Sequence, residues 1–417
     1  MRDLSGLAEM SVAELLGADG ISSWLQPIVR LDSREVVAVE ALARGPVGGD
    51  LHLPGSLFQA ATAEGLVTEL EWGCRKAAYR SAATAGLAPG VCVFVNVESA
   101  QLGAPPPAEV AEAAQRLRGR RIVLELTERQ LVRRPADVLR AVYAARSQGW
   151  GIALDDVGAE PESLALMPVL RPDVVKLDMG LVQRRATRET GRIASAVASY
   201  AEESGATVLA EGIEDELHFE RAIALGATLG QGWLFAHPRP PADVQVAEPS
   251  EPIALLDEPA MAPHATPFEL VGQHLQTRVA RKGQLLAMSH HLERQTSDLP
   301  TPPLLLAAFE HARHFTTATA RRYREYGRRS SLVAAFGEGL DQQPELGVRG
   351  ASLDSDDPLS CEWTVVVLGS HFAGALIARD LGDGGVDRER RFEFAITHRR
   401  DHVTAAARCL IARIAAQ

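Results

Sequence analysis

Two aspartates stand side by side at the end of a short apolar run in this 417-residue chain. The run 151–154 has the length and composition of a buried strand, and Asp155 and Asp156 follow it at once. Adjacent carboxylates repel each other, so the pair either binds a cation or divides into a strand-end residue and a helix cap. The pair alone does not decide between these two interpretations.

Other apolar runs in the first 240 residues end in polar residues of a similar kind. These residues are Glu40, Asn96, Glu125, Lys176 and Glu211. Together with the aspartate pair, Glu40, Asn96 and Glu125 would offer oxygen ligands from four strands, which suits hard divalent cations such as Mg²⁺ or Mn²⁺. Without a bound cation, we expect some of these carboxylates to have raised pKa values.

The elements that position these residues alternate between strand and helix. Segments rich in Ala, Leu, Glu and Arg predict helices over residues 54–85, 107–117, 135–148 and 188–204. Nearly continuous apolar strands imply a parallel sheet covered on both faces, and the number of repeats favours a closed α/β barrel, whose strand C-termini meet at one mouth. An open doubly wound sheet is the competing architecture, but its glycine fingerprint is missing after the early strands.

Composition limits the partners and the location of the protein. The formal net charge of −11 argues against a nucleic-acid polymer or an anionic membrane surface as the main partner. The four cysteines are far apart, and the chain has no recognisable signal peptide and no apolar run of membrane-spanning length, so we expect a cytoplasmic protein.

The proline-rich segment 241–266 divides the chain into a barrel at 1–240 and a second α/β or α+β domain at 267–417. The segment is either a linker or an ordered strap. In the second domain, the residue patterns predict helices over 267–294, 303–335 and 403–416 and a strand over 362–368.

Seven motifs follow one another in order between about residues 20 and 240. They are Glu40-Ala41-Leu42-Ala43-Arg44, Val95-Asn96-Val97, Glu125-Leu126-Thr127-Glu128, Leu154-Asp155-Asp156, Pro172-Asp173-Val174-Val175-Lys176-Leu177-Asp178, Ala210-Glu211-Gly212-Ile213-Glu214 and Gly230-Gln231-Gly232. Together they resemble the EAL family of cyclic di-GMP phosphodiesterases. The resemblance implies a TIM-like (β/α)8 barrel with one antiparallel strand, and metal-dependent hydrolysis of cyclic di-GMP to linear pGpG.

The resemblance also implies roles for single residues. The metal ligands would be Glu40, Asn96, Glu125, Asp155 and Asp156, with Asp155 bridging two Mg²⁺ or Mn²⁺ ions. The catalytic residues would be Glu211 as the general base, Lys176 beside the attacking water, and Glu214, which would support Glu211 from one helical turn further on. The substrate contacts would be Gln26, Arg44, Gln231 and Asp178, which would continue the strand face of Lys176. Glu128 would anchor the loop after the aspartates.

The loop Val157–Glu162 departs from the family pattern. It reads Val-Gly-Ala-Glu-Pro-Glu where the family usually has Phe-Gly-Thr/Ala-Gly-aromatic-Ser. Pro161 fixes its own φ angle and should stiffen the loop, and two glutamates add charge near the mouth. Two functions therefore stand as alternatives: a phosphodiesterase regulated by its C-terminal domain, and a cyclic di-GMP receptor that hydrolyses weakly or not at all and signals through that domain.

Residues from about 267 resemble the DICT sensory domain. The matching segments are Pro267-Phe268-Glu269-Leu270 and residues 285–293, 362–367 and 391–394. The resemblance implies a sensory or regulatory role with an unknown signal or partner. For the whole chain, we expect cyclic di-GMP as the ligand and a homodimer as the oligomeric state.

Overall fold

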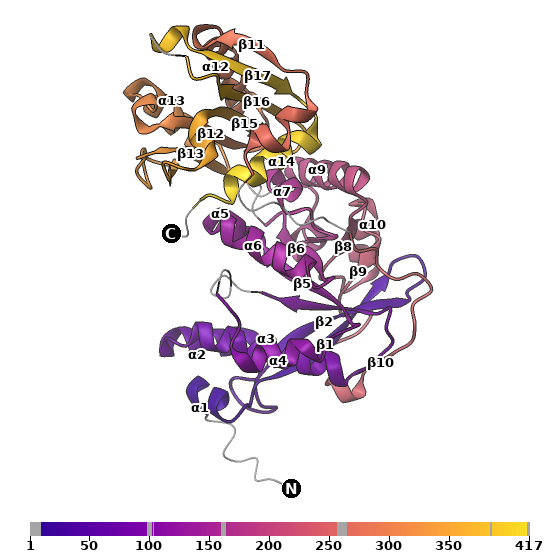
Figure 1. Cartoon of the computed structure of the whole chain (residues 1–417). Coiled ribbons are helices and arrows are strands. Elements are labelled where there is room, and N and C mark those ends of the chain that lie inside the picture. The colour runs from indigo at the N-terminus through magenta and orange to yellow at the C-terminus, as the bar shows by residue number, and fades with distance from the viewer. Residues whose placement is uncertain are drawn as a thin grey trace.

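The computed structural model describes residues 10–97, 102, 104–159, 164–256, 265–383 and 386–414, except for the side chains of residues 128, 129 and 131. The described residues form a barrel, coloured from indigo to pink, and a second sheet domain, coloured orange and yellow (Figure 1). No helix within these ranges is both long enough and apolar enough to cross a bilayer.

Eight strands close into the barrel in the order β1-β2-β4-β5-β6-β7-β8-β9. Their bounds are β1 Ser22–Arg30, β2 Val36–Arg44, β4 Cys92–Asn96, β5 Arg121–Thr127, β6 Gly151–Val157, β7 Val174–Leu177, β8 Thr207–Ala210 and β9 Leu229–Gly230. Strand β1 is antiparallel to both of its neighbours, whereas the other pairs are parallel. This topology confirms the predicted TIM-like barrel with one antiparallel strand.

Helices surround the barrel. They are α1 Val12–Gly17, α2 Pro54–Glu64, α3 Val67–Thr84, α4 Ala108–Gln115, α5 Glu128–Arg133, α6 Pro135–Arg146, α7 Met167–Leu170, α8 Met179–Gln183, α9 Arg188–Ser204 and α10 Glu216–Ala224. The single helix predicted over 54–85 is two helices, because Gly65 ends α2 with a left-handed φ of 70°. The other three predicted barrel helices correspond to α4, α6 and α9.

The segment after the barrel is an ordered strap as far as residue 256. It contains η3 Pro241–Asp243 and β10 Gln245–Val246, which pairs with β3 Gly86–Leu87. Ile253 is buried among the inward-facing side chains of the barrel strands. The backbone of Leu256 donates to the carboxylate of Asp173, which lies just before β7. These contacts tie the strap to the barrel at the end where its parallel strands begin.

The second domain is built on a seven-stranded mixed sheet in the order β11-β17-β16-β15-β12-β13-β14. Its strands are β11 Arg278–Arg281, β12 Leu304–His311, β13 Leu332–Glu338, β14 Arg349–Leu353, β15 Glu362–Leu368, β16 Ala373–Asp380 and β17 Arg391–Thr397. Its helices are α11 Pro267–Leu270, α12 Lys282–Asp298, α13 Thr317–Gly327 and α14 Arg400–Ile411, with short turns η4 Gly272–His274, η5 Ala312–His314, η6 Pro358–Cys361 and η7 Asp387–Glu389.

Two helix predictions in this domain are wrong. Residues 267–294 contain α11, η4, β11 and only part of α12, and residues 303–335 contain two strands around α13. The run Leu304–Phe309 is rich in Leu and Ala and therefore looked helical, but it belongs to β12, whose residues Leu304–Ala308 are buried between β13 and β15. The strand predicted over 362–368 is confirmed as β15.

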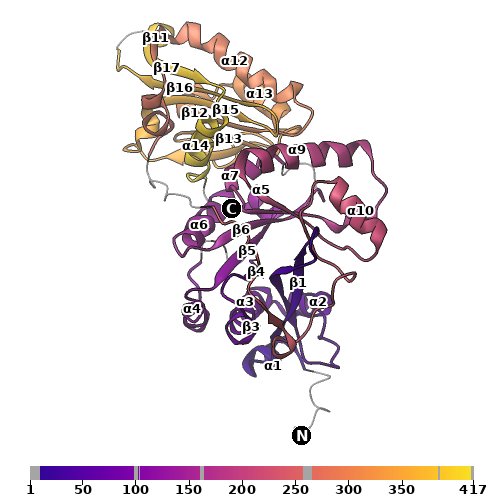
Figure 2. The ribbon, with the colours of Figure 1, turned by 90° about the vertical axis from the view of Figure 1, so that its right-hand side faces the viewer.

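Helix α14 joins the two domains. One buried apolar cluster includes Val403, Ala406 and Leu410 of α14, residues of β12 and β15, and residues of α6, α7 and β5 in the barrel. Figure 2 shows α14 between the second sheet and the helices α6, α7 and α9. Because the cluster is continuous, the domain contact is apolar and extensive rather than a loose tether.

Glu362 is a buried acid at the start of β15. Burial raises its pKa to about 7, although the backbone N–H of Phe268 and the Thr266 hydroxyl donate to it. Because the folded-state pKa lies above the ordinary value of 4.5, the folded protein loses stability as pH rises from about 4.5 to about 7. We therefore expect Glu362→Gln to have little effect below pH 5 and to stabilise the protein by about 2 kcal/mol at pH 8.

Thermal melts of both proteins between pH 5 and 8.5 measure this difference. Glu325→Gln, an exposed change in α13, is the control. A Glu362→Gln effect that is independent of pH would contradict the prediction.

Candidate active site at the barrel mouth

The predicted site residues gather at the mouth where the parallel strands end. Asn96 is the last residue of β4, Asp155 and Lys176 lie near the ends of β6 and β7, and Glu211 follows β8. Strand β2 continues four residues past Glu40, to Arg44, so Glu40 lies inside the strand rather than at its end. The register places Asn96 opposite Glu125 on the neighbouring strand. Strand pairing thus brings side chains from distant parts of the sequence together.

Lys176 is at the centre of the carboxylates. Its Nζ lies 3.0 Å from Oδ1 of Asp155, 2.7 Å from Oε1 of Glu211 and 3.9 Å from Oε1 of Glu40, and it also forms an ion pair with Glu125. The lysine is 1% exposed. The sequence predicted a lysine near the attacking water, but its contact with four carboxylates was not predicted. A lone lysine after the apolar pair Val174-Val175 was the available signal.

Glu40 is held by two amides. Nδ2 of Asn96 donates to its Oε1 at 3.2 Å, and Nε2 of Gln231 donates to its Oε2 at 2.6 Å. The same Gln231 nitrogen lies 3.2 Å from Oε1 of Gln26. Gln26 in turn donates to the carbonyl of Ala236 at 3.1 Å. The structure therefore brings two predicted substrate contacts into the same hydrogen-bonded group as a predicted metal ligand.

Glycines on both sides of Gln231 allow this arrangement. A Cβ atom at Gly232 would lie 2.0 Å from the carbonyl oxygen of Ile213, and one at Gly230 would lie 2.5 Å from the Leu31 side chain. The backbone N–H of Ile213 donates to the Gln231 carbonyl at 3.0 Å. Any larger residue at these two positions would push the chain away and displace the Gln231 amide.

Burial and crowding shift the titration of the site. Burial, with Glu40 and Asp155 adding to it, raises the pKa of Glu125 well above its ordinary value even though Lys176 opposes the shift. The same causes raise the pKa of Glu211 to about 8. Burial alone would lower the pKa of Lys176. The surrounding carboxylates, Asp155 first, outweigh burial and raise this pKa well above its ordinary value. These directions agree with the raised carboxylate pKa values expected for metal-free protein.

The aspartate pair has an unusual backbone. Asp156 has a left-handed φ of 58°, and the pairing of β6 with β7 is irregular between Leu154 and Val157. The N–H of Asp156 donates to Oδ1 of Asp155 at 3.0 Å. This bend turns the neighbouring aspartates toward the same region: ligand oxygens of Asp155, Asp156 and Glu211 lie within 4.8 Å of one another.

The side chains present fit a divalent cation. The mouth contains five carboxylates, Glu40, Glu125, Asp155, Asp156 and Glu211, and one ammonium group contacts four of them. Glu125 is buried, its Oε1 faces the Lys176 ammonium, and its Oε2 accepts no hydrogen bond from the described residues. A buried acceptor without a donor is costly, and a cation would satisfy it. The donor atoms are the hard oxygens that Mg²⁺ and Mn²⁺ prefer.

Three other predicted residues differ from expectation or lie partly outside the described structure. The chain leaves β7 before Asp178, so the prediction that it continues the strand face of Lys176 is wrong: its carboxylate caps α8 by accepting from Gly180 N at 2.8 Å. Glu214 is also not one helical turn from Glu211, because residues 211–214 form a loop with Gly212 at φ 65°, and Glu214 is exposed. Glu128 begins α5, but its side chain lies outside the described residues.

Arg44, the last predicted substrate contact, is buried at the end of β2. Its Nη1 donates to the carbonyl of Ala43 at 2.7 Å, and its guanidinium lies 5.7 Å from the centre of the Trp24 ring. Of the altered loop, only Val157, Gly158 and Ala159 fall within the described residues, and the latter part of the predicted departure lies outside them.

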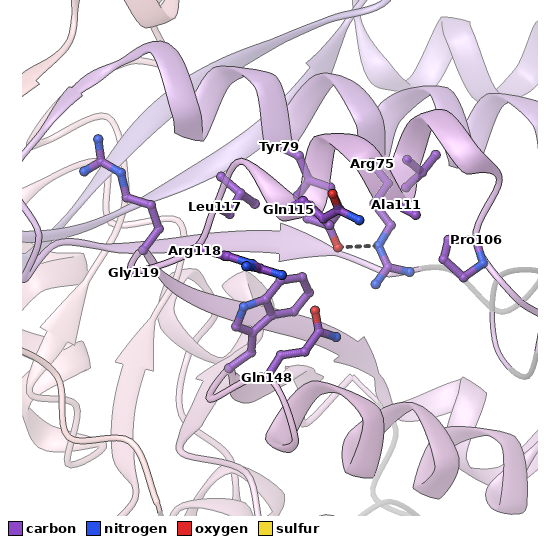
Figure 3. A pocket seen from close by; sticks show the side chains of 13 residues that line it. Arg75, Tyr79, Pro106, Ala111, Gln115, Leu117, Arg118, Gly119 and Gln148 are labelled. Carbon is purple, nitrogen blue, oxygen red and sulfur yellow. Dashed lines mark hydrogen bonds between the residues drawn. The ribbon is translucent and has the colours of Figure 1, made fainter.

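The barrel has one cavity at the site and another on its flank. One of about 200 Å³ is lined by Asn96, Ala41 and Ala43, among others. A second, of about 440 Å³, lies on the flank of the barrel along α4 (Figure 3), and none of the predicted site residues lines it.

Comparison with known proteins is consistent with this geometry. Residues 9–238 match the model of the EAL domain, and residues 269–381 match that of the "Sensory domain in DIguanylate Cyclases and Two-component system". Cyclic di-GMP phosphodiesterase RocR of Pseudomonas aeruginosa is 31% identical over 240 residues, which cover 55% of this chain and 61% of RocR. Uncharacterized protein Rv1357c of Mycobacterium tuberculosis is 32% identical, over 52% of this chain and 74% of that protein.

A similar solved structure is the complex of BlrP1 from Klebsiella pneumoniae with manganese and cyclic di-GMP. Its sequence is 27% identical and its TM-score is 0.47, and the match covers 54% of this chain and 57% of the BlrP1 chain. This chain matches less than two thirds of the length of RocR.

The EAL domain model matches more than half of the residues of this chain. The chain therefore belongs to the EAL domain family.

Proposed function

We propose that this chain hydrolyses cyclic di-GMP to linear pGpG at the barrel mouth, using two Mg²⁺ or Mn²⁺ ions. The observation that carries the proposal is the group of five carboxylates around a buried lysine, in which Oε2 of Glu125 accepts no described hydrogen bond. Support comes from the similarity to RocR, a cyclic di-GMP phosphodiesterase.

Glu40, Asn96, Glu125 and Asp155 would hold one cation, and Asp155 and Asp156 would share the second. When bound, two divalent cations lower the pKa of an attacking water and stabilise negative charge on the phosphoryl oxygens. The hydrogen bonds from Asn96 and Gln231 fix the orientation of the Glu40 carboxylate before any ligand arrives.

The remaining residues would bind the substrate and accept a proton from the attacking water. Glu211 has a pKa of about 8 in the metal-free protein and would act as the general base in its ionised form, which bound cations would favour. Lys176 supplies a fixed positive charge beside it at 2.7 Å. Gln26, Arg44, Asp178 and Gln231 would contact the substrate. Glu214 would support Glu211, and Glu128 would anchor the loop after the aspartates.

A product assay tests this function. Purified full-length protein is incubated with cyclic di-GMP and Mg²⁺ or Mn²⁺, and pGpG is followed by chromatography. We expect pGpG with either metal and none with excess EDTA. Binding of cyclic di-GMP without product would instead support the receptor alternative, in which the departure at Val157–Glu162 has removed turnover.

We infer that the C-terminal domain regulates this site through two arginines. Nε of Arg408 in α14 donates to the carbonyl of Val169 at 2.6 Å, and Nη1 of Arg349 in β14 donates to the carbonyl of Arg133 at 2.9 Å. Val169 and Arg133 lie in the last turns of α7 and α5, where helix carbonyls lack intrahelical partners and favour positive charge.

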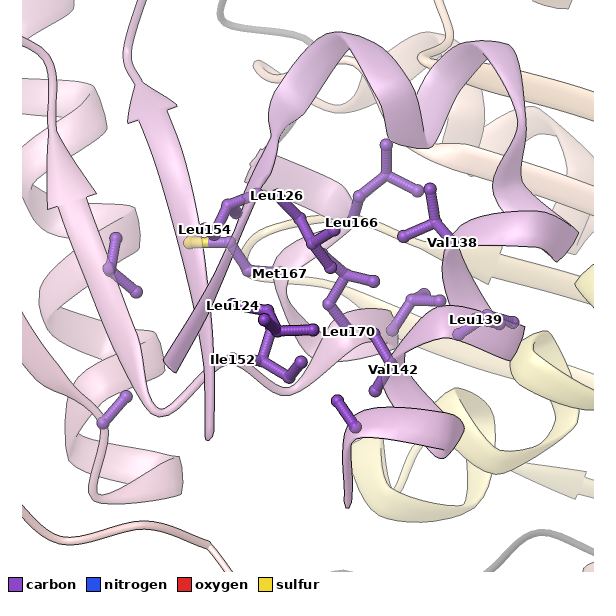
Figure 4. Close-up of a cluster of buried hydrophobic side chains, with 14 of the residues drawn as sticks. Leu124, Leu126, Val138, Leu139, Val142, Ile152, Leu154, Leu166, Met167 and Leu170 are labelled. Carbon is purple, nitrogen blue, oxygen red and sulfur yellow. The ribbon is translucent and has the colours of Figure 1, made fainter. Parts of the chain in front are cut away.

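These two helices follow the strands that carry the metal ligands. Helix α5 begins directly after β5, which contains Glu125, and α7 is the next helix after β6, which contains Asp155. Figure 4 shows Met167 and Leu170 of α7 packed with Leu124 and Ile152 of these strands. A shift of the C-terminal domain would therefore move helix ends that are packed against the metal-ligand strands.

The double variant Arg349→Ala/Arg408→Ala is expected to lower the hydrolysis rate about fivefold, which corresponds to about 1 kcal/mol of coupling. Arg192→Ala is the matched control, because it removes a hydrogen bond to Pro300 of the second domain without touching α5 or α7. The measurement is the steady-state rate of cyclic di-GMP hydrolysis by the unaltered protein, the double variant and Arg192→Ala. Equal rates for the double variant and the unaltered protein would count against this route of regulation.

The homodimer remains a prediction. Light scattering of the full-length protein as it elutes from a size-exclusion column, with and without cyclic di-GMP, would measure its mass. A mass of twice that of one chain is expected.

A further inference from the structure

The cavity on the flank of the barrel is separate from the mouth. It has a volume of about 440 Å³ and lies between α3, α4 and the segment before β6 (Figure 3). Small-molecule sites usually have volumes of about 300–1,000 Å³, so the space suits a mononucleotide-sized ligand. Arg75 lines this cavity and also the smaller one that contains Asn96.

The charge of this cavity is opposite to that of the protein. Three arginines line it, Arg75, Arg118 and Arg120, and none of its described lining residues is an aspartate or glutamate. The side chain of Arg118 forms no ion pair or hydrogen bond with any described residue, and that of Arg120 donates to the carbonyl of Leu87. In a chain with a net charge of −11, a cavity lined by arginines without acids is a local site of positive potential.

Aromatic side chains form another part of the wall. The rings of Tyr79 and Trp150 meet edge to face with centroids 5.7 Å apart. Arg75 donates through Nε to the Tyr79 hydroxyl at 2.7 Å, and its guanidinium lies 5.6 Å from the centre of that ring. The hydrogen bond fixes the Arg75 guanidinium in place. Both rings are buried, so Tyr79 backs the Arg75 guanidinium, and the guanidinium plane is the surface on which a base can stack.

Two amide side chains complete the lining. Gln115 and Gln148 lie on opposite sides of the cavity, one from the end of α4 and the other just after α6, and both are exposed (Figure 3). Each amide can donate and accept hydrogen bonds, as the polar edge of a nucleobase requires. The lining thus combines cationic, aromatic and amide groups.

We propose that this cavity binds a nucleotide, with the phosphate at Arg118 and Arg120 and the base between the Arg75 guanidinium and the glutamine amides. Guanidinium groups are well suited to phosphate because they donate two parallel hydrogen bonds. The site is independent of the hydrolysis proposed for the mouth. Because Arg75 lines both cavities, a ligand here would also touch the side chain next to the Asn96 cavity.

Calorimetric titration of the full-length protein with GMP, in EDTA and with saturating cyclic di-GMP, tests the proposal. We expect one GMP per chain, with an affinity at least ten times that of inorganic phosphate because the base adds stacking contacts. Raising the salt concentration should weaken binding. Arg118→Glu should lower the affinity for GMP at least tenfold.

Arg116→Glu is the matched control. It makes the same charge change two residues away, at an exposed arginine that pairs with Glu112 and does not line the cavity. Equal losses in both variants would show unspecific charge attraction and overturn the proposal. The absence of GMP binding, or its loss when cyclic di-GMP is added, would overturn it as well. Phosphate binding as tightly as GMP would reject the nucleotide assignment.

Discussion

Replacing Glu40 by Ala is expected to lower the rate of cyclic di-GMP hydrolysis at least about a thousandfold. The carboxylate is buried, and two amides hold it in one orientation while Lys176 lies 3.9 Å away. Its removal would delete an anionic ligand and leave the Asn96 and Gln231 amides without their acceptor. No neighbouring carboxylate can replace it, because the others are already fixed by their own strands.

Two further variants make this result specific. Glu40→Gln keeps the size of the side chain but not its charge, so we expect a loss close to that of Glu40→Ala if the charge binds a cation. Glu216→Gln, an exposed glutamate in the first turn of α10, should leave the rate unchanged. Retention of more than a tenth of the normal rate in Glu40→Ala would mean that Glu40 is not a metal ligand.

Replacing Lys176 by Met is expected to abolish turnover and to destabilise metal-free protein by about 3–5 kcal/mol, the usual cost of removing one partner from a buried ion pair. Four carboxylates would then face one another without their shared counter-charge. A divalent cation restores positive charge to the same space. Mn²⁺ should therefore raise the melting temperature of Lys176→Met by more than that of the unaltered protein.

Lys282→Met is the matched control for this effect. Lys282 is also buried and forms an ion pair, with Asp387, but it lies in the second domain. Melting curves with and without Mn²⁺ should show no selective rescue of Lys282→Met. If Mn²⁺ stabilises both variants equally, the cation does not bind among the Lys176 carboxylates.

The sequence predicted the barrel well because most of its parallel strands are short apolar runs with a distinctive polar residue at or near the end. Residues such as Asn96, Asp155 and Glu211 mark strand ends, and the alternation with helices determines that these ends meet. The second domain was harder. Its central strand β12 has the Leu and Ala composition of a helix, and only its neighbours β13 and β15 in the sheet make it a strand.

Details of the site depended on backbone geometry that spacing alone does not reveal. The left-handed φ angles at Asp156 and Gly212 redirect the chain, so Glu214 is exposed rather than stacked on Glu211. The contact of Lys176 with four acids required three-dimensional pairing of β7 with its neighbours. Likewise, the composition of the strap also fits a flexible linker, and its pairing with β3 and its burial of Ile253 show that it is ordered.

The position of Mn²⁺ in crystals of the full-length protein, measured by anomalous scattering, shows whether the carboxylates at the barrel mouth bind two cations. We expect two anomalous peaks at the barrel mouth, separated by about 3.5–4 Å. One should contact Glu40, Asn96, Glu125 and Asp155, and the other should share Asp155 and contact Asp156. The absence of any peak within reach of these oxygens, at Mn²⁺ concentrations that support catalysis, would contradict the account.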